Sequence, residues 1–279
     1  MSHRISQGKI FYSLFKCGFL ALVAMLSLLP VWLMITNSLK RSVEISVMPP
    51  KFLFRPVLTH YNKMFANDDF LSYFKNSVVV AAASTTGSVI FSLMAAYGFL
   101  ITKSKWFGKI TDLLLLSKMV MPITVLIPLY IILNAMGLIG SYFGPVVAHA
   151  AINIPFVIWL FLGFMRELPK ELIEASRIDG CTRPAALWKI LLPLLTPAVG
   201  AAIILAGQYS WNELLFSIQL TKVSTYTLTV AIAKYVGAVA VDWGKSSAAA
   251  CVTMIPVIIL GFAMQKYLVR GLTAGAVKG

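Results

Sequence analysis

Residues 143–164 read FGPVVAHAAINIPFVIWLFLGF and contain no Asp, Glu, Lys or Arg. An α-helix rises about 1.5 Å per residue, so a stretch of this length crosses a hydrocarbon core of about 30 Å. Five further windows are comparably long and apolar. The sequence therefore predicts an all-α integral membrane protein with six transmembrane helices, at about 17–37, 74–101, 111–133, 143–164, 194–217 and 247–267.

Composition excludes a water-soluble fold. Hydrophobic residues make up 59% of the 279 residues, charged residues only 12%, and the mean hydropathy is +0.84. Soluble domains carry about 25% charged residues. The net charge of +14 comes largely from Lys and Arg between apolar runs, which indicates membrane orientation rather than nucleic-acid binding. The excess lies in the N-terminal segment, in the loops after spans two and four, and in the C-terminal tail, so both termini are expected in the cytoplasm.

The segment between spans four and five differs from the other loops. Residues 166–184 read RELPKELIEASRIDGCTRP and hold four of the ten acidic residues in the chain. Pro169 suits the first turn of a short amphipathic helix, and Gly180 suits its end because glycine readily adopts a positive φ. A second short helix is expected from Pro184 to Ile190, ending at Pro193. Two short helices joined at a glycine would form a stiff knob that transmits a push.

This segment resembles the "EAA" loop of permeases of binding-protein-dependent ABC importers. The match comprises Glu174-Ala175-Ser176, then Gly180, then Ile190 and Leu192-Pro193 at the family's spacing, with Ser176 in place of the usual alanine. The resemblance implies a coupling helix seated in a groove of a cytoplasmic ATPase subunit, with these residues as its core: Pro169, Glu171, Glu174, Ala175, Ser176, Asp179 and Gly180. An ordinary amphipathic interfacial helix is the alternative.

Nearly the whole chain resembles the MalG type, the shorter permease of carbohydrate importers. The residues that carry this likeness are Pro30-Val31-Trp32, Asn76-Ser77, Ala95-Ala96-Tyr97-Gly98-Phe99, Pro128, Trp211-Asn212-Glu213 and the ending from Val269 to Gly279. The resemblance implies one permease domain over 1–279, with a first span and external loop in 1–69, a family core at about 70–270 and a cytoplasmic tail at 269–279. That tail is expected to reach between the ATPase subunits as a docked strand or hook, through Thr273, Ala274, Gly275 and Lys278.

The same resemblance implies the partners. They are a second permease subunit, two cytoplasmic subunits that bind ATP and Mg, and an extracytoplasmic solute-binding protein, all at a bacterial or archaeal cytoplasmic membrane. The chain itself is expected to be non-catalytic and to hold no cofactor. Its Gly244-Lys245-Ser246 is not a P-loop, because Val239 stands where that motif requires glycine. The three histidines are scattered along the sequence and form no metal-ligand pattern.

Polar residues inside the spans are candidates for lining a transport path, because polar groups within a membrane face protein or a cavity. Span five offers Gln208, Asn212 and Gln219 at spacings of four and seven, hence on one face, with Glu213 about 100° away. Span four offers His149 and Asn153. Hydrogen bonding between helices is an equally good reading of these side chains. Lys118 is expected to snorkel to the interface, with a role in transport as the alternative.

Two rival functions stay open. An ion-driven secondary transporter would need acidic residues at mid-depth or inverted repeats, and the span interiors hold almost no acid. An importer permease for a non-sugar solute would share every feature above. The solute itself is not fixed by the sequence: a disaccharide or oligosaccharide is favoured, and a polyol or an acidic sugar fits equally.

Overall fold

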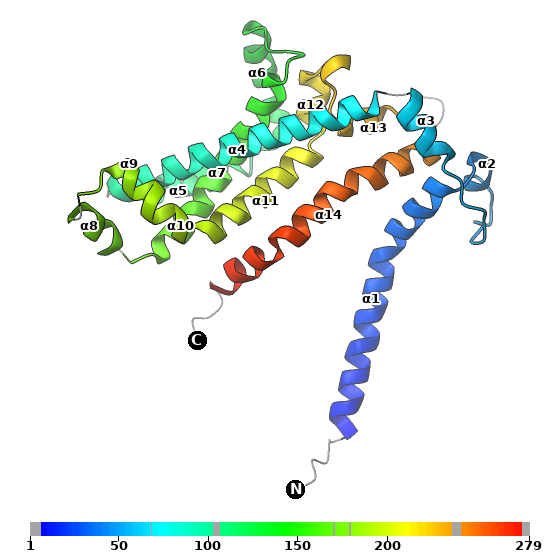
Figure 1. The fold of residues 1–279 in the computed structure, drawn as a ribbon, viewed down its shortest axis with the longest axis horizontal. Coiled ribbons are helices and arrows are strands. Elements are labelled where there is room, and N and C mark those ends of the chain that lie inside the picture. Colours follow the sequence, from blue (N-terminus) through cyan, green and yellow to red (C-terminus); the bar gives the residue numbers. More distant parts are fainter. Residues whose placement is uncertain are drawn as a thin grey trace. The chain divides into compact units, whose positions relative to one another are not determined.

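The computed structural model describes residues 7–67, 69–102, 107–169, 171–178, 180–235 and 241–274. Every helix or strand assigned within these ranges is a helix (Figure 1). The chain forms two compact units, one from 1–68 and 234–254 and the other from 69–233 and 255–279. Asp179, Gly275 and Lys278, which the sequence nominated as contacts to an ATPase, lie outside the described residues.

The first unit is built on α1 (Gln7–Leu39), the short α2 (Ser42–Ile45), α3 (Thr59–Asn67) and the beginning of α14 (Trp243–Ala274). Side chains of α3 hold the end of α1. Tyr61 donates from its hydroxyl to Ser38 Oγ at 2.9 Å, and His60 Nε2 bonds the carbonyl of Lys40 at 2.9 Å. The expected first span is therefore a continuous helix whose far end is fixed by α3.

The second unit packs three helices around one core: α4 (Phe70–Thr102), α7 (Phe143–Glu167) and α11 (Thr196–Asn212), which run side by side (Figure 1). Small residues such as Ala96, Ala202 and Ala206 are fully buried where the helices meet. Without a large hydrophobic gain between helices in lipid, close approach through small residues and polar bonds drives their association. One such bond joins Ser84 Oγ of α4 to Ser210 Oγ of α11 at 2.7 Å.

Two of the expected spans are broken. The span predicted at 111–133 consists of α5 (Phe107–Ser117) and α6 (Pro122–Ala135), which meet at 90°. Proline disfavours helix in the residue before it, and Met121 is extended at φ −62° and ψ 132°, so Pro122 begins a new helix. The expectation of one continuous third helix was wrong.

The span predicted at 194–217 is interrupted at both ends. Helix α11 ends at Asn212, Glu213 is extended, and α12 (Leu215–Leu220) follows as a separate helix. Gln219 is therefore not on one face with Gln208 and Asn212, and that prediction was wrong. A 3-10 helix (Val223–Thr225) and α13 (Leu228–Lys234) complete this region.

The number of crossings depends on how the bent pairs count. Among the residues that the structure describes, four helices are long and apolar enough to cross a membrane, at Tyr12–Leu39, Phe70–Thr102, Phe143–Glu167 and Trp243–Ala263. Two bent pairs raise the count to six if each is one crossing, Lys109–Ser117 with Pro122–Ala135 and Arg183–Leu194 with Thr196–Asn212.

The two short helices expected after span four are present. The first is α8 (Glu171–Ile178). The second begins as α9 (Arg183–Ala186), continues through a π-helical turn (Leu187–Leu191) and ends as α10 (Leu192–Leu194). It therefore passes through Pro193 instead of stopping there. In the π turn the N–H of Leu192 donates to the carbonyl of Leu187, one residue further back than in an α-helix.

The expected extended tail is helical in its described part. Helix α14 continues to Ala274, so Thr273 and Ala274 are its last residues. The prediction of a strand or hook beginning near 269 was wrong for residues 269–274, because the helix of the sixth span continues through them.

Candidate functional site

The break between α11 and α12 is organised by one buried carboxylate. Glu213 accepts four hydrogen bonds: from the backbone N–H of Phe216 at 2.8 Å and of Ser217 at 3.0 Å, from Ser217 Oγ at 3.0 Å, and from His149 Nε2 at 2.9 Å. The first two satisfy N–H groups in the first turn of α12, which have no partner within their own helix. The negative charge also sits at the positive end of that helix. Glu213 thus acts as a cap that lets the chain restart as a helix.

His149 connects this carboxylate to two further helices. The imidazole is fully buried on α7, and its second nitrogen, Nδ1, bonds Ser210 Oγ of α11 at 2.7 Å. Ser210 in turn bonds Ser84 of α4. The resulting chain from Glu213 through His149 and Ser210 to Ser84 is a polar network that crosses the core of the second unit. Buried networks of this kind stabilise one arrangement when every member is satisfied.

Asn153, one turn further along α7, has the same kind of role. Its side-chain N–H donates to the carbonyl of Ala206 at 3.3 Å, and the residue is 2% exposed. In this structure the side chains of His149 and Asn153 therefore form hydrogen bonds between helices and do not line a pocket. This is the second of the two readings that the sequence allowed.

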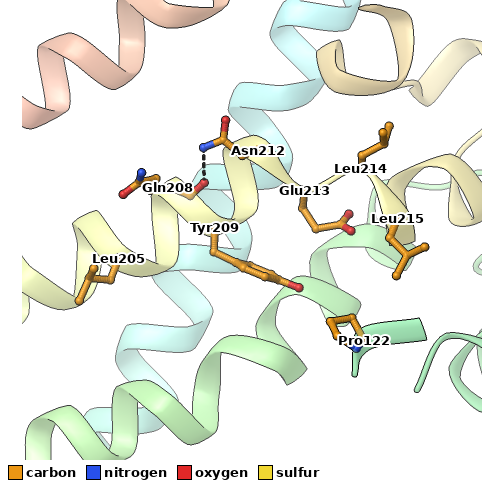
Figure 2. A pocket seen from close by; sticks show the side chains of 8 residues that line it. All are labelled: Pro122, Leu205, Gln208, Tyr209, Asn212, Glu213, Leu214 and Leu215. Carbon is orange, nitrogen blue, oxygen red and sulfur yellow. Dashed lines mark hydrogen bonds between the residues drawn. The ribbon is translucent and has the colours of Figure 1, made fainter. Parts of the chain in front are cut away.

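The other three candidates from the sequence do meet at one pocket. It has a volume of about 560 Å³ and is lined by Pro122, Leu205, Gln208, Tyr209, Asn212, Glu213, Leu214 and Leu215. Figure 2 shows Gln208 and Asn212 projecting from α11, and Tyr209 extending toward Pro122 at the start of α6. Asn212 donates one side-chain N–H to the carbonyl of Gln208 at 2.9 Å, which leaves its amide oxygen available to a solute. The break between α5 and α6 and the break between α11 and α12 therefore border the same pocket.

Two further side chains lie near this pocket: Tyr209, which the sequence did not nominate, and Lys118, for which a role in transport was the alternative to snorkelling. The Tyr209 ring stands edge-on to the His149 ring, with centroids 6.2 Å apart. The ammonium of Lys118 lies over the faces of both Tyr209 and Phe156, 5.6 Å from each centroid. Tyr209 has no distinguishing sequence signal in an apolar run, and Lys118 was expected within a continuous helix. Its contacts arise because the chain turns between α5 and α6.

The knob formed by α8 and α9 turns at Gly180, where the sequence predicted the end of the first short helix. Gly180 has φ +78°, and the N–H of Cys181 donates to the carbonyl of Ser176 at 2.9 Å, the six-to-one bond of a Schellman helix end. Ser176 faces inward at 2% exposed, whereas Ile178 is 86% exposed and Ala175 is also exposed.

Metal-ligating side chains are scattered over the described residues. No three His, Cys, Asp or Glu side chains gather closely enough within them to hold a metal ion. Two amides, a carboxylate and a phenol line a space large enough for a small solute, and the Lys118 ammonium lies over the Tyr209 ring, so the pocket is suited to binding.

Apolar helices around a polar pocket, with a rigid helical knob at one end of the bundle, define a polytopic membrane protein of the transport class. Comparison with known proteins gives the family. The binding-protein-dependent transport system inner membrane component family matches residues 88–274. The chain belongs to this family of multi-pass inner-membrane proteins.

Relatives align along almost the whole chain. The chain is 34% identical over 251 residues to the sulfoquinovosyl glycerol transport system permease protein SmoH of Agrobacterium fabrum, covering 89% of this chain and 88% of that protein. It is 29% identical over 265 residues to the trehalose/maltose transport system permease protein MalG of Thermococcus litoralis, covering 92% and 94%. The resemblance to MalG-type permeases is confirmed.

A solved structure shares the fold. A chain of a bacterial ABC transporter involved in the import of the acidic polysaccharide alginate superposes with a TM-score of 0.81. The match covers 95% of this chain and 99% of that chain, at 20% sequence identity.

Proposed function

We propose that this protein is the permease subunit of an ATP-driven, binding-protein-dependent carbohydrate importer. Family membership and relatives named for sugar transport support the class, and the pocket beside α11 supports the solute. Amide groups on a concave surface suit the hydroxyls of a saccharide. The partners follow from the family: a second permease, two ATP-hydrolysing subunits and an extracytoplasmic binding protein. The chain itself contributes binding and movement, not catalysis.

The single observation that carries the coupling role is the knob at α8. Its turn at Gly180 is held by a positive φ and by the Cys181 to Ser176 bond, so α8 moves as a rigid piece. Helices α8 to α10 lie at one end of the second unit, where α4 ends and α11 begins (Figure 1). Movement of an ATPase subunit against α8 would therefore be transmitted directly to α11, which lines the pocket. Such two-state rigid-body motion is a common form of switching in transporters.

Orientation follows from the same assignment. With α8 docked on an ATPase, the loop after span four is cytoplasmic, and the Lys and Arg distribution then places both termini on that side. The α14 end, with Thr273 and Ala274, would face the same compartment and would be free to contact the ATPase subunits. Glu171 and Glu174 lie on α8 and would take part in the docking.

One observation favours a second function, an ion-driven transporter. The ionisable pair His149 and Glu213 is buried within the helical core, and such pairs mark proton or ion paths in other membrane proteins. Its bonds assign it a structural role here, because all four donors to Glu213 come from the chain itself. ATP dependence of uptake separates the two functions directly.

The test uses the complete complex in proteoliposomes, with ATP hydrolysis and solute uptake measured together. Gly180→Pro cannot adopt the required φ, since proline fixes φ near −65°, and we expect hydrolysis without uptake. Gly180→Asn is the matched control, because asparagine tolerates this conformation, and it should keep most of the coupling. Normal ATP-driven uptake by Gly180→Pro would contradict the coupling role. Uptake that follows an ion gradient without ATP would contradict the importer assignment.

A further inference from the structure

Lys118 stands at the turn between α5 and α6, next to the pocket and without an anionic partner. Its backbone N–H bonds the carbonyl of Leu115 at 3.0 Å, which closes the end of α5. The ammonium contacts two aromatic faces, those of Phe156 and Tyr209. Within the described ranges of the chain, no carboxylate forms a salt bridge with it. An ammonium that contacts two rings and forms no salt bridge within the described residues is available to an incoming anion.

Glu213, the carboxylate that lines the pocket, already accepts hydrogen bonds from the chain itself. Both oxygens of Glu213 are occupied by donors from α7 and α12, as described above. A contact between a cation and ring faces offsets only part of the hydration that the cation gives up on leaving water. A cation held in this way at a solute pocket therefore gains most from a ligand that carries negative charge.

Tyr209 links the cation to the pocket. Its ring forms part of the pocket wall and at the same time receives the Lys118 ammonium on its face. The Gln208 amide and the free Asn212 amide oxygen line the same space. A solute there would meet amides suited to hydroxyls, the Tyr209 ring, the Glu213 carboxylate whose oxygens already accept bonds from the chain, and a nearby positive charge suited to a carboxylate or sulfonate.

We propose that Lys118, Tyr209, Gln208 and Asn212 form a subsite for the anionic group and adjacent ring of an acidic saccharide. This inference rests on the proposed importer function and narrows its solute to sugars bearing a carboxylate or sulfonate. A neutral sugar would find the same amides but would gain less from the ammonium, because a hydroxyl is a weaker acceptor than a carboxylate or sulfonate. A lysine that only anchors the protein to lipid phosphate is the competing role, and it predicts no dependence on the charge of the solute.

The experiment compares matched solutes on the reconstituted complex with its binding protein. The pairs are sulfoquinovosyl glycerol against glucosyl glycerol, and cellobiouronate against cellobiose, each measured as ATP-driven uptake. We expect the wild-type complex to transport at least one acidic member in preference to its neutral counterpart. For that solute, Lys118→Gln should reduce uptake at sub-saturating concentration by about tenfold, the effect of one charged hydrogen bond. Lys118→Arg, which keeps the charge, should stay within about threefold.

The control is Lys75→Gln, which removes the same charge from an exposed lysine of α4 and should leave uptake unchanged. Preference for the neutral members, or equal uptake of an acidic solute by Lys118→Gln and wild type, would overturn the subsite while leaving the importer function intact. A loss by Lys118→Gln that is equal for acidic and neutral solutes, and that varies with the anionic lipid content of the vesicles, would overturn it in favour of a lipid anchor. Absence of ATP-driven uptake of any carbohydrate by the wild type would instead refute the proposed function.

Discussion

Removing the Glu213 carboxylate should destabilise the junction of α11 and α12 more than any other single polar change in the second unit. Glu213→Ala leaves the N–H groups of Phe216 and Ser217 without their acceptor and leaves His149 without its anionic partner. Removing one member of a buried, bonded charge pair costs about 3–5 kcal/mol. Globular domains are stable by only about 5–15 kcal/mol, so this is a large fraction of what holds such a fold together.

The loss of stability should affect α12 before the rest of the fold, because the Glu213 carboxylate caps only this short helix. Each 1.4 kcal/mol of local destabilisation speeds amide exchange about tenfold, so about 3 kcal/mol corresponds to roughly a hundredfold. Hydrogen exchange of the purified protein in nanodiscs should therefore show the peptide containing Phe216 and Ser217 opening first. Glu213→Gln keeps the shape and one acceptor oxygen and should lose less, about 1–3 kcal/mol.

A double-mutant cycle measures how much of this destabilisation comes from the contact between Glu213 and His149. The side chains of His149 and Glu213 are bonded to each other in the wild type. The destabilisation by His149→Ala plus that by Glu213→Ala should therefore exceed the destabilisation of the double variant by about 1–3 kcal/mol. The matched control is Asn212→Ala, at the neighbouring exposed position, which should leave amide exchange in α12 unchanged. Wild-type exchange at Phe216 and Ser217 in Glu213→Ala would refute the capping role.

Three further predictions concern other parts of the chain. Ile178→Asp should weaken binding of the ATPase subunit by about 2 kcal/mol, since an exposed isoleucine that becomes buried gains roughly that amount, and copurification at graded salt measures it. In a variant whose other two cysteines are replaced by serine, Cys181 should react with an impermeant maleimide only in inverted vesicles stripped of the ATPase. Labelling from outside intact cells would place the knob on the external face of the membrane and contradict the coupling role. Gly244→Ala should cost about 1–3 kcal/mol, because its methyl would overlap the His60 ring and disturb the bond to Lys40; an unchanged unfolding temperature would argue that the ring moves freely.

The regular parts of the fold were predictable because they depend on local chemistry. Apolar runs of membrane length predict the uninterrupted helices α1, α4, α7 and α14. Pro169 predicts the beginning of α8, and Gly180 predicts its end. The breaks were harder to predict. Pro122 reads equally well as a kink or as a helix start, and the choice depends on what satisfies the freed backbone groups nearby. Glu213 gives no sequence signal for a break, because a single acid in an apolar run could equally face a cavity.

The candidate site was half predictable for the same reason. Spacing along one helix places Gln208 and Asn212 together, since residues four apart share a face. Spacing does not tell whether a polar group finds a partner across the interface, and in this structure His149 and Asn153 do. The contact of Lys118 with Tyr209 joins residues 91 positions apart and depends on the turn between α5 and α6. Such contacts depend on tertiary packing and not on periodicity.

The two helix breaks have one physical consequence in common. Within a membrane, backbone that leaves the helix must be satisfied by protein or must border water, because lipid offers no hydrogen bonds. At the α11 break the carboxylate of Glu213 satisfies the freed N–H groups, and at the α6 start Pro122 has no N–H to satisfy. Both residues line the pocket that also contains Gln208 and Asn212. An unbroken pair of helices would have no reason to place these groups around a polar space. The breaks at Pro122 and Glu213 are therefore consistent with the proposed solute path along this part of the second unit, and the knob at α8 lies at the other end of α11.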